Sequence, residues 1–205
     1  RGTGGPINVS ESRVARDIVD AWVDAAEHAG YSHNSDYNSG SQGGVGHFQM
    51  TMRNGKRCSS ATAYLKPIQK RKNLSIFTDA KTNKVVFEEK RAVAVDCLIR
   101  GVKTRITAKA EIILAAGAIG SPQLLMLSGL GAGGELAPHG IDVENDLPGV
   151  GKNLQDHLQA RPVFKCISST INTEIKSVVQ RLAIAIKYML TGSGPMAMAA
   201  SLATA

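Results

Sequence analysis

The most constraining feature of the sequence is an apolar run followed at once by a turn of small residues. Residues 111–116 read EIILAA, and residues 117–122 read GAIGSP. A short apolar run of this kind predicts a strand buried on both faces, as in the parallel layer of an α/β protein. Ser121 suits the N-cap of a following helix, and Pro122 suits its first position, where the missing N–H costs nothing. We therefore expect a strand, a tight turn and a helix at residues 123–127.

The turn between that strand and that helix is suited to a close approach by a ligand. Gly117 and Ala118 have small side chains, and the first N–H groups of a helix lack intrahelical acceptors. This arrangement predicts a nucleotide contact at the carboxyl end of a strand. A strand-to-helix turn that binds nothing requires the same residues, so both interpretations stay open at this point.

Periodic apolar residues predict three further helices. The first begins at a serine cap, either Ser10 or Ser12, and has one apolar residue per turn. The second is short and is disturbed by Pro67, and the third begins at Thr173. The apolar stripe of the first helix comprises Val14, Ile18, Trp22 and Ala26. The predicted spans are residues 10–29, 61–65 and 173–190.

The middle of the chain is rich in β-branched residues that alternate with polar ones. This pattern is typical of antiparallel strands with one exposed face. The Asn54-Gly55 pair predicts a tight turn. With the helices, these strands indicate an α/β fold of mixed α+β character. The predicted strands span residues 47–52, 74–78, 84–88, 92–99, 103–108 and 159–165.

The composition excludes several classes of protein. The formal charge is +7, from 24 Lys and Arg against 17 Asp and Glu. The dense basic cluster KPIQKRK at residues 66–72 has no interleaved aromatic residue for base stacking, so we expect a solvated helix end and no nucleic-acid partner. The longest apolar stretch, residues 182–190, is too short to span a bilayer. Three widely spaced cysteines predict no disulfide framework and a reducing, cytoplasmic location.

The sequence lacks a complete catalytic or cofactor motif. No GxGxxG follows a predicted strand, and neither a GxSxG elbow nor a CxxC pair is present. The five histidines show no metal-ligand spacing. Asp156 and His157 are neighbours, and adjacent side chains rarely face one another, so we expect them to fix a loop. The residues alone therefore predict no catalytic residue and no metal ligand.

The segment GAIGSPQLLMLSGLG, at residues 117–131, resembles the second signature of the glucose–methanol–choline (GMC) family of flavin oxidoreductases. Five other segments agree in the same order: GTGGPINVS, DYN, GKRCSSATAYLKP, NLSIFTDAKT and LPGVGKNLQDH. The resemblance covers almost the whole chain. The flavin fingerprint of the family would precede residue 1 and its catalytic histidine would follow residue 205, so we expect a central fragment of a longer protein.

The resemblance implies an FAD-dependent oxidoreductase that acts on the CH–OH group of an alcohol. In such an enzyme a histidine base takes the hydroxyl proton and a hydride passes to flavin N5. Choline-type members tend to have a glutamate in this part of the chain, and Leu202 is the residue nearest to that position. The lack of a carboxylate there favours an uncharged alcohol as the substrate. The alternative is a non-catalytic fragment that acts as a structural or interaction module. The expected partners are the alcohol, the remaining segments of the protein and a second copy in a homo-oligomer.

The resemblance also implies which residues contact the cofactor. Thr82 stands where the family commonly has a valine whose backbone recognises the adenine of FAD. Ala116 and Gly117 match the end of a strand that lies beside the adenosine portion of FAD in the family. Asn153 and His157 match a loop beside the substrate domain, and we assign them no catalytic role.

The domain organisation follows from the same resemblance. Residues 55–157 look like part of a Rossmann-like FAD-binding domain, with an antiparallel β excursion before the buried strand. Residues 1–54 and 158–205 look like parts of a substrate-binding domain. Without the first βαβ unit, one edge of the parallel layer would be unpaired and its apolar surface exposed.

Overall fold

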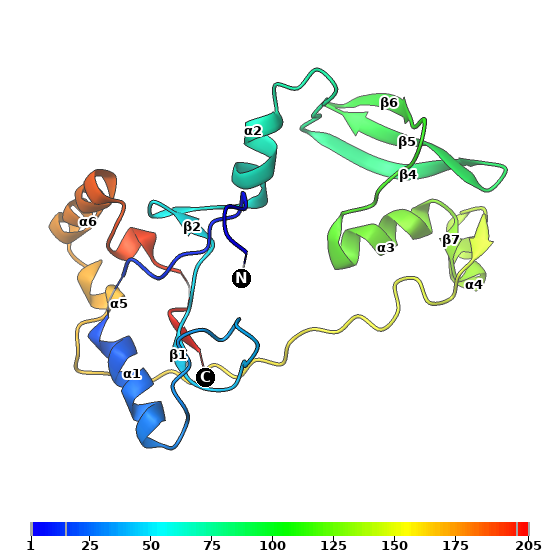
Figure 1. Ribbon diagram of the computed structural model, residues 1–205. Coiled ribbons are helices and arrows are strands. Elements are labelled where there is room, and N and C mark those ends of the chain that lie inside the picture. The colour runs from blue at the N-terminus through cyan, green and yellow to red at the C-terminus, as the bar shows by residue number, and fades with distance from the viewer. Residues whose placement is uncertain (1, 15, 200, 205) are drawn as a thin grey trace. The chain divides into compact units, whose positions relative to one another are not determined.

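The computed structural model describes residues 2–14, 16–199 and 201–204, and the fold is a mixed α/β one with small sheets that are antiparallel except for one parallel pair, β7 (Leu130–Gly131) with β8 (Asn145–Asp146). The chain forms two compact units that interleave along the sequence (Figure 1). The first unit comprises residues 1–74 and 163–205, and the second comprises residues 75–162. Which segments contact flavin and which contact substrate stays a prediction.

The second unit is built on a three-stranded antiparallel sheet (Figure 1). Val85, Ala94 and Cys97 are buried in its core. The three strands predicted for this part of the chain are confirmed, because alternating β-branched residues give a sheet one face that can be buried. In spatial order the strands are β4 (Ala80–Glu88), β5 (Arg91–Ile99) and β6 (Val102–Thr107).

Helix α3 (Gly117–Leu127) packs against β4 in this unit. The predicted start at residue 123 is wrong, since Ser121 is not the N-cap and Pro122 lies inside the helix. The backbone turns at Gly117, whose φ is +80°, and the helix begins there. The Ser121 hydroxyl accepts a hydrogen bond from the Ala116 N–H at 3.0 Å, so Ser121 supports the helix start from within the helix. The unit also contains β7 (Leu130–Gly131), α4 (Gly133–Leu136), η2 (Ala137–His139) and β8 (Asn145–Asp146).

Residues 111–116 form no strand, contrary to the sequence prediction. The segment runs up to α3 without pairing to any strand in the described ranges, and Ile113 is 78% exposed. A strand forms only where a neighbouring strand takes up its backbone hydrogen bonds. Residues 74–78 and 159–165 are unpaired in the same way, and β4 begins only at Ala80.

Among the described residues of the first unit, two helices have ten or more residues, α1 (Asp17–His28) and α6 (Val178–Thr191) (Figure 1). The predicted turn at Asn54 and Gly55 is confirmed. Both residues have positive φ, 51° and 73°, which suits the tight two-residue turn of a hairpin. The short strands pair as β1 (Gly46–His47) with β9 (Ala203–Thr204) and β2 (Met52–Arg53) with β3 (Lys56–Arg57). The other elements are η1 (Ala61–Leu65), α2 (Lys66–Ile68), α5 (Ile171–Glu174) and η3 (Pro195–Ala197).

The apolar face of α1 differs from the predicted one. The helix begins at Asp17, later than either predicted serine cap. Trp22 is 46% exposed, whereas Val23 is 3% exposed and Val19 is half-buried. Residues 19 and 23 are four apart and share one face, and this face packs in the unit. The predicted stripe through Trp22 is therefore wrong.

The predicted helix over residues 173–190 is two helices. Thr170 caps α5 and forms a capping box with Thr173, which lies inside that helix. The chain then leaves the helical path, and Ser177 caps α6 by accepting the Gln180 N–H at 3.5 Å. Two successive caps explain the break, because each satisfies N–H groups that begin a new helix.

The described part of the chain has no helix that is both long and apolar enough to cross a membrane. Cys58 and Cys97 are buried free thiols, and Cys166 is an exposed one.

Candidate functional site

The turn at Gly117 leaves the backbone open to an approaching molecule. Apart from its chain neighbours and the nearby backbone of its own helix, a Cβ atom placed on Gly117 would meet no heavy atom within 4 Å. The φ of +80° is in the left-handed region, which glycine adopts without steric cost. Ala116, Gly117 and Ala118 are all exposed. Both the conformation and the open space at this turn therefore depend on glycine.

The start of α3 also offers unsatisfied hydrogen-bond donors. Its N-cap residue, Ala116, provides no side-chain cap. The first N–H groups of a helix have no intrahelical acceptor, and together they carry a partial positive charge. The exposed first turn of α3 can therefore donate hydrogen bonds to a polar or anionic ligand.

Thr82 lies in β4, which is an edge strand of the sheet. It is half-buried and lies opposite Cys97, with 3.8 Å between the hydroxyl and the thiol sulfur. The register shifts between Thr82 and Lys84, so Asn83 has no partner in the ladder. Such a bulge bends an edge strand and frees local backbone groups.

A buried hydrogen bond joins the strand of Thr82 to the helix that begins at Gly117. The Val85 N–H donates to the Ser128 hydroxyl at 2.8 Å, and Ser128 follows α3 directly and is 6% exposed. The structure thus places β4 and α3 in one packed body. A cavity of about 230 Å³ lies at this junction, but Thr82, Ala116 and Gly117 do not line it.

Three histidines, His33, His47 and His157, each contact a carboxylate. The Asp156 carboxylate accepts the backbone N–H of His157 at 2.8 Å, which is a contact within the loop. His33 and His47 lie against carboxylates of α1, with Nδ1 of His33 at 2.5 Å from Glu27 and Nε2 of His47 at 2.9 Å from Asp20. Among the described residues no group of His, Cys, Asp and Glu has the geometry to hold a metal ion.

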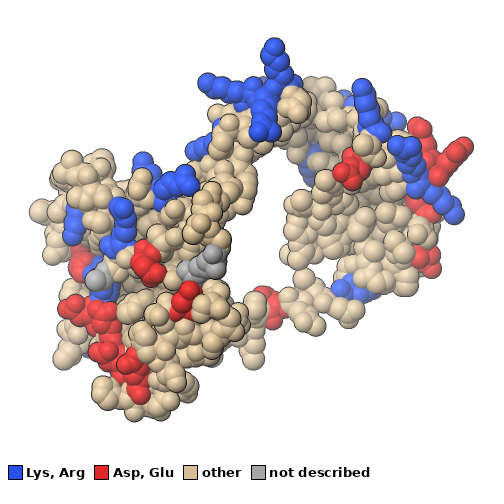
Figure 2. All heavy atoms as spheres, in the orientation of Figure 1, with Lys and Arg blue, Asp and Glu red and all other residues tan. Residues whose placement is uncertain are grey.

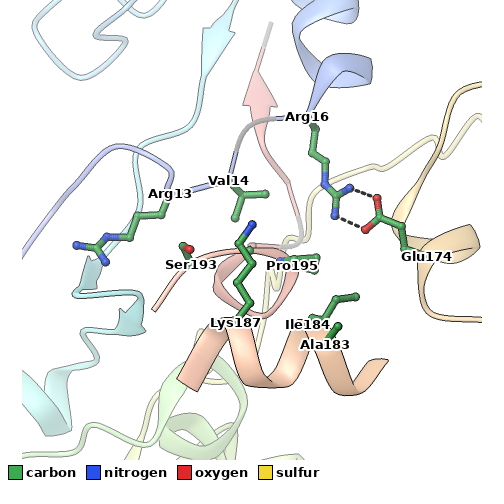
Figure 3. Close-up of a pocket in the computed structure, with 10 residues that line it drawn as sticks. Arg13, Val14, Arg16, Glu174, Ala183, Ile184, Lys187, Ser193 and Pro195 are labelled. Atoms are coloured by element: carbon green, nitrogen blue, oxygen red, sulfur yellow. Dashed lines mark hydrogen bonds and ion pairs between the residues drawn. The ribbon is translucent and has the colours of Figure 1, made fainter. Parts of the chain in front are cut away.

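One polar feature of the first unit was missed by sequence reasoning. Arg16, the N-cap residue of α1, forms two hydrogen bonds with Glu174 of α5, at 2.5 and 3.0 Å (Figure 3). The hydrogen bond from Arg16 holds the pKa of Glu174 below its ordinary value. Both residues line a cavity of about 510 Å³. No sequence pattern pairs two residues that lie 158 positions apart.

Comparisons with known sequences place the chain in a family. The family model for GMC oxidoreductase matches residues 3–159. An oxygen-dependent choline dehydrogenase of Brucella suis is 40% identical over 197 residues, which is 95% of this chain and 36% of that protein. An alcohol dehydrogenase (acceptor) of Pseudomonas putida is 45% identical over 159 residues, covering 77% of this chain and 29% of that protein. The chain spans about a third of the length of these relatives.

Solved structures agree with this placement. The structure of an FAD-dependent oxidoreductase from Chaetomium thermophilum superposes with a TM-score of 0.86 and 27% identity. The match covers 99% of this chain and 36% of the Chaetomium chain. Pyridoxine 4-oxidase from Mesorbium loti superposes with a TM-score of 0.72 and 32% identity, and the match covers 76% of this chain and 31% of the oxidase chain. The resemblance seen in the sequence is confirmed, and the chain belongs to the GMC oxidoreductase family.

Proposed function

We propose that this chain is the part of an FAD-dependent alcohol oxidoreductase that contacts the adenosine end of the flavin. Membership of the GMC family supports the oxidoreductase class, and the names of the relatives support a CH–OH substrate. The observation that carries the proposal is the open, exposed turn at Gly117, within the segment that resembles the family signature.

Three residues would hold the adenosine portion through their backbones. Ala116 and Gly117 present an unobstructed main chain at the start of α3, and Thr82 lies beside a bulge on an edge strand. These features fit a flat, polar group that approaches main-chain atoms closely. When bound, FAD supplies the hydride acceptor, and the role of these residues is to bind and orient it. We assign no proton transfer to the histidines of this chain.

The substrate is proposed to be a small alcohol. The Brucella and Pseudomonas relatives are named for choline and for alcohol, and Leu202 stands nearest the position where choline-type members have a glutamate. Without that carboxylate the site favours an uncharged alcohol over a quaternary ammonium ion. Anaerobic flavin bleaching in the full-length protein, with choline and with a primary alcohol in parallel, distinguishes the two.

The test of the cofactor contact is Gly117→Val in the full-length protein. A branched side chain at this turn would occupy the space in front of the backbone and would strain a φ of +80°. We expect flavin to be lost during purification, measured as absorbance per mole of protein. Gly101→Val is the matched control, because Gly101 has a φ of +85° and equally open space but lies in the turn between β5 and β6. Normal flavin content in the Gly117 variant would refute the assignment.

The alternative function is a non-catalytic structural or interaction module, and the isolated 205-residue chain tests it. We expect this chain to bind FAD only weakly, because its GxGxxG, which reads GLGAGG at residues 129–134, follows helix α3 and not the strand that a pyrophosphate-binding turn requires. The measurement is a flavin titration by fluorescence quenching. Stoichiometric binding at micromolar concentration would show that the cofactor site lies within this chain.

Two further points are proposed about the protein in the cell. Free thiols at Cys58, Cys97 and Cys166 support a reducing, cytoplasmic location, which microscopy of the tagged full-length protein tests. A homo-oligomer is also proposed, and the mass of the purified protein in solution tests it.

A further inference from the structure

The positive charge of this chain is concentrated in one stretch. Residues 37–78 contain seven Lys and Arg and no Asp or Glu, so this stretch alone carries a charge of +7. The other 17 Lys and Arg are balanced by 17 Asp and Glu. Figure 2 shows part of this charge as a group of basic side chains around the end of α2. The seven residues are Arg53, Lys56, Arg57, Lys66, Lys70, Arg71 and Lys72.

Within this stretch the β2–β3 hairpin holds two like charges face to face. Arg53 and Lys56 are direct partners in the ladder, on either side of the Asn54-Gly55 turn. Directly opposed residues of an antiparallel pair have their side chains on one face, where like charges repel. No carboxylate in the described ranges forms an ion pair with either residue. A bound anion would remove this repulsion.

The hairpin is fixed against the C-terminal end of α6. The Tyr188 hydroxyl of α6 donates a hydrogen bond to the Gly55 carbonyl at 3.1 Å. A Cβ on Gly55 would lie 1.8 Å from the carbonyl oxygen of Gly192, so the two backbones touch. Beside this contact is a cavity of about 490 Å³. Its charged lining residues are Arg13, Arg53, Lys56 and Arg57, with no Asp or Glu among them.

Two of these four cations already have partners. Arg13 extends away from Lys187 (Figure 3), and it donates to the Thr191 carbonyl at the end of α6, at 3.5 Å. Arg53 donates to the Pro6 carbonyl at 3.2 Å. The side chains of Lys56 and Arg57 make no hydrogen bond or ion pair with any residue in the described ranges. The cavity therefore has two cationic groups with unused donors.

We propose that the cavity between the β2–β3 hairpin and the end of α6 binds a phosphate group. A phosphate monoester or diphosphate has two or more negative charges, which match the two unpartnered cations. The guanidinium of Arg57 can donate two parallel hydrogen bonds to phosphate oxygens, and the Lys56 ammonium supplies a compact charge. This site lies in the first unit, whereas the residues of the proposed flavin contact belong to the second.

The test uses inorganic pyrophosphate as the probe and calorimetry on the full-length protein at constant ionic strength. We expect saturable binding, which Lys56→Gln weakens at least tenfold. Lys70→Gln is the matched control, since Lys70 belongs to the same acid-free stretch but does not line the cavity. It should change the affinity less than twofold. Without the probe, Lys56→Gln should melt no lower than the parent protein, because it removes the repulsion with Arg53.

Vesicles containing an anionic phospholipid form a second arm of the test. Vesicle binding that Lys56→Gln abolishes and Lys70→Gln preserves would also support the phosphate site, with a lipid headgroup as the source. The proposal is overturned if neither probe binds saturably. It is also overturned if Lys70→Gln weakens binding as much as Lys56→Gln. Binding would then depend on the total positive charge of the stretch and not on the cavity. The flavin content of the variants should equal that of the parent protein.

Discussion

Strand β5 and residues 111–116 lie in the same compact unit, and both have the sequence pattern of a strand, yet only β5 is one. Strand β5 is bordered by β4 and β6, and its residues Ala94 and Cys97 are 2% and 5% exposed. Residues 111–116 are the more apolar of the two, but Ile113 is 78% exposed and nothing in the described ranges pairs with the segment.

The difference shows that the two segments depend on different kinds of partner. The partners of β5 are joined to it by short turns, so the hairpins β4–β5 and β5–β6 form from neighbouring sequence. A buried strand of a parallel layer requires a crossover connection and distant partners. Apolar content alone therefore does not make a strand, and the distance to its partner in the sequence decides whether it forms.

Hydrogen exchange should give the largest contrast between the two segments. In the 205-residue chain, interior amides of β5 should be protected about a thousandfold more than those of residues 111–115, because only β5 amides are bonded to neighbouring strands. Mass spectrometry of peptides from each segment measures this. Equal protection would mean that residues 111–115 are paired in solution, and the comparison would fail.

Truncation of one side chain in each region should give the next largest difference. Val85→Ala removes methyl groups from a residue that is 5% exposed, and it should lower the free energy of unfolding by about 2 kcal/mol. Ile113→Ala removes a larger but exposed group and should cost about 0.5 kcal/mol or less. Urea unfolding of the isolated chain measures both. A cost for Ile113→Ala as large as that for Val85→Ala would show that the segment packs.

The ion pair between Arg16 and Glu174 should give the smallest effect on the free energy of unfolding, and this effect should depend on pH. The pKa of Glu174 is lowered in the folded state by the hydrogen bond from Arg16, so its stabilising contribution is present above the ordinary pKa of 4.5 and is lost as the pH falls through the folded pKa. Glu174→Gln should therefore cost about 1 kcal/mol at pH 7 and progressively less below about pH 4.5.

Glu135→Gln is the control for this prediction. Glu135 forms an ion pair with Lys152, as Glu174 does with Arg16, but the side chains of Glu135 and Lys152 are about half exposed. It should change the stability by less than Glu174→Gln at pH 7. If both variants show the same pH dependence, the Arg16–Glu174 pair contributes no more than an ordinary surface ion pair.

The features predicted correctly from the sequence are those that neighbouring residues determine. The Asn54-Gly55 turn forms because both residues tolerate positive φ, and the three middle strands form because each lies beside the next along the chain. The turn of small residues at Gly117 was also identified, but the helix start was not. The left-handed φ at Gly117 and the bond from Ala116 to Ser121 begin α3 earlier than the cap-and-proline pattern indicates.

The candidate sites divide in the same way. The sequence indicated the turn of small residues at Gly117, and the family resemblance named Thr82, which the structure places on an edge strand. It did not locate the Arg16–Glu174 pair or the cationic cavity at the hairpin, because each joins residues from opposite ends of the chain. Helix α1 shows the same limit on a smaller scale, since its sequence offers two apolar faces and only contact with the rest of the unit selects the one at Val23.

By itself the sequence determined the family, the local turns and strand hairpins, and the stretch of unbalanced positive charge. These follow from residue identity and from contacts a few positions apart, which need no knowledge of distant segments. The tertiary structure alone decided which face of α1 is buried, where α3 begins, and that residues 111–116 pair with no strand in the described part of the chain. It also placed Arg13 beside the hairpin cations. The physical reason is that burial, pairing and cavity formation depend on which distant segments meet, and backbone hydrogen bonds and apolar contacts stabilise a segment only where a partner is present.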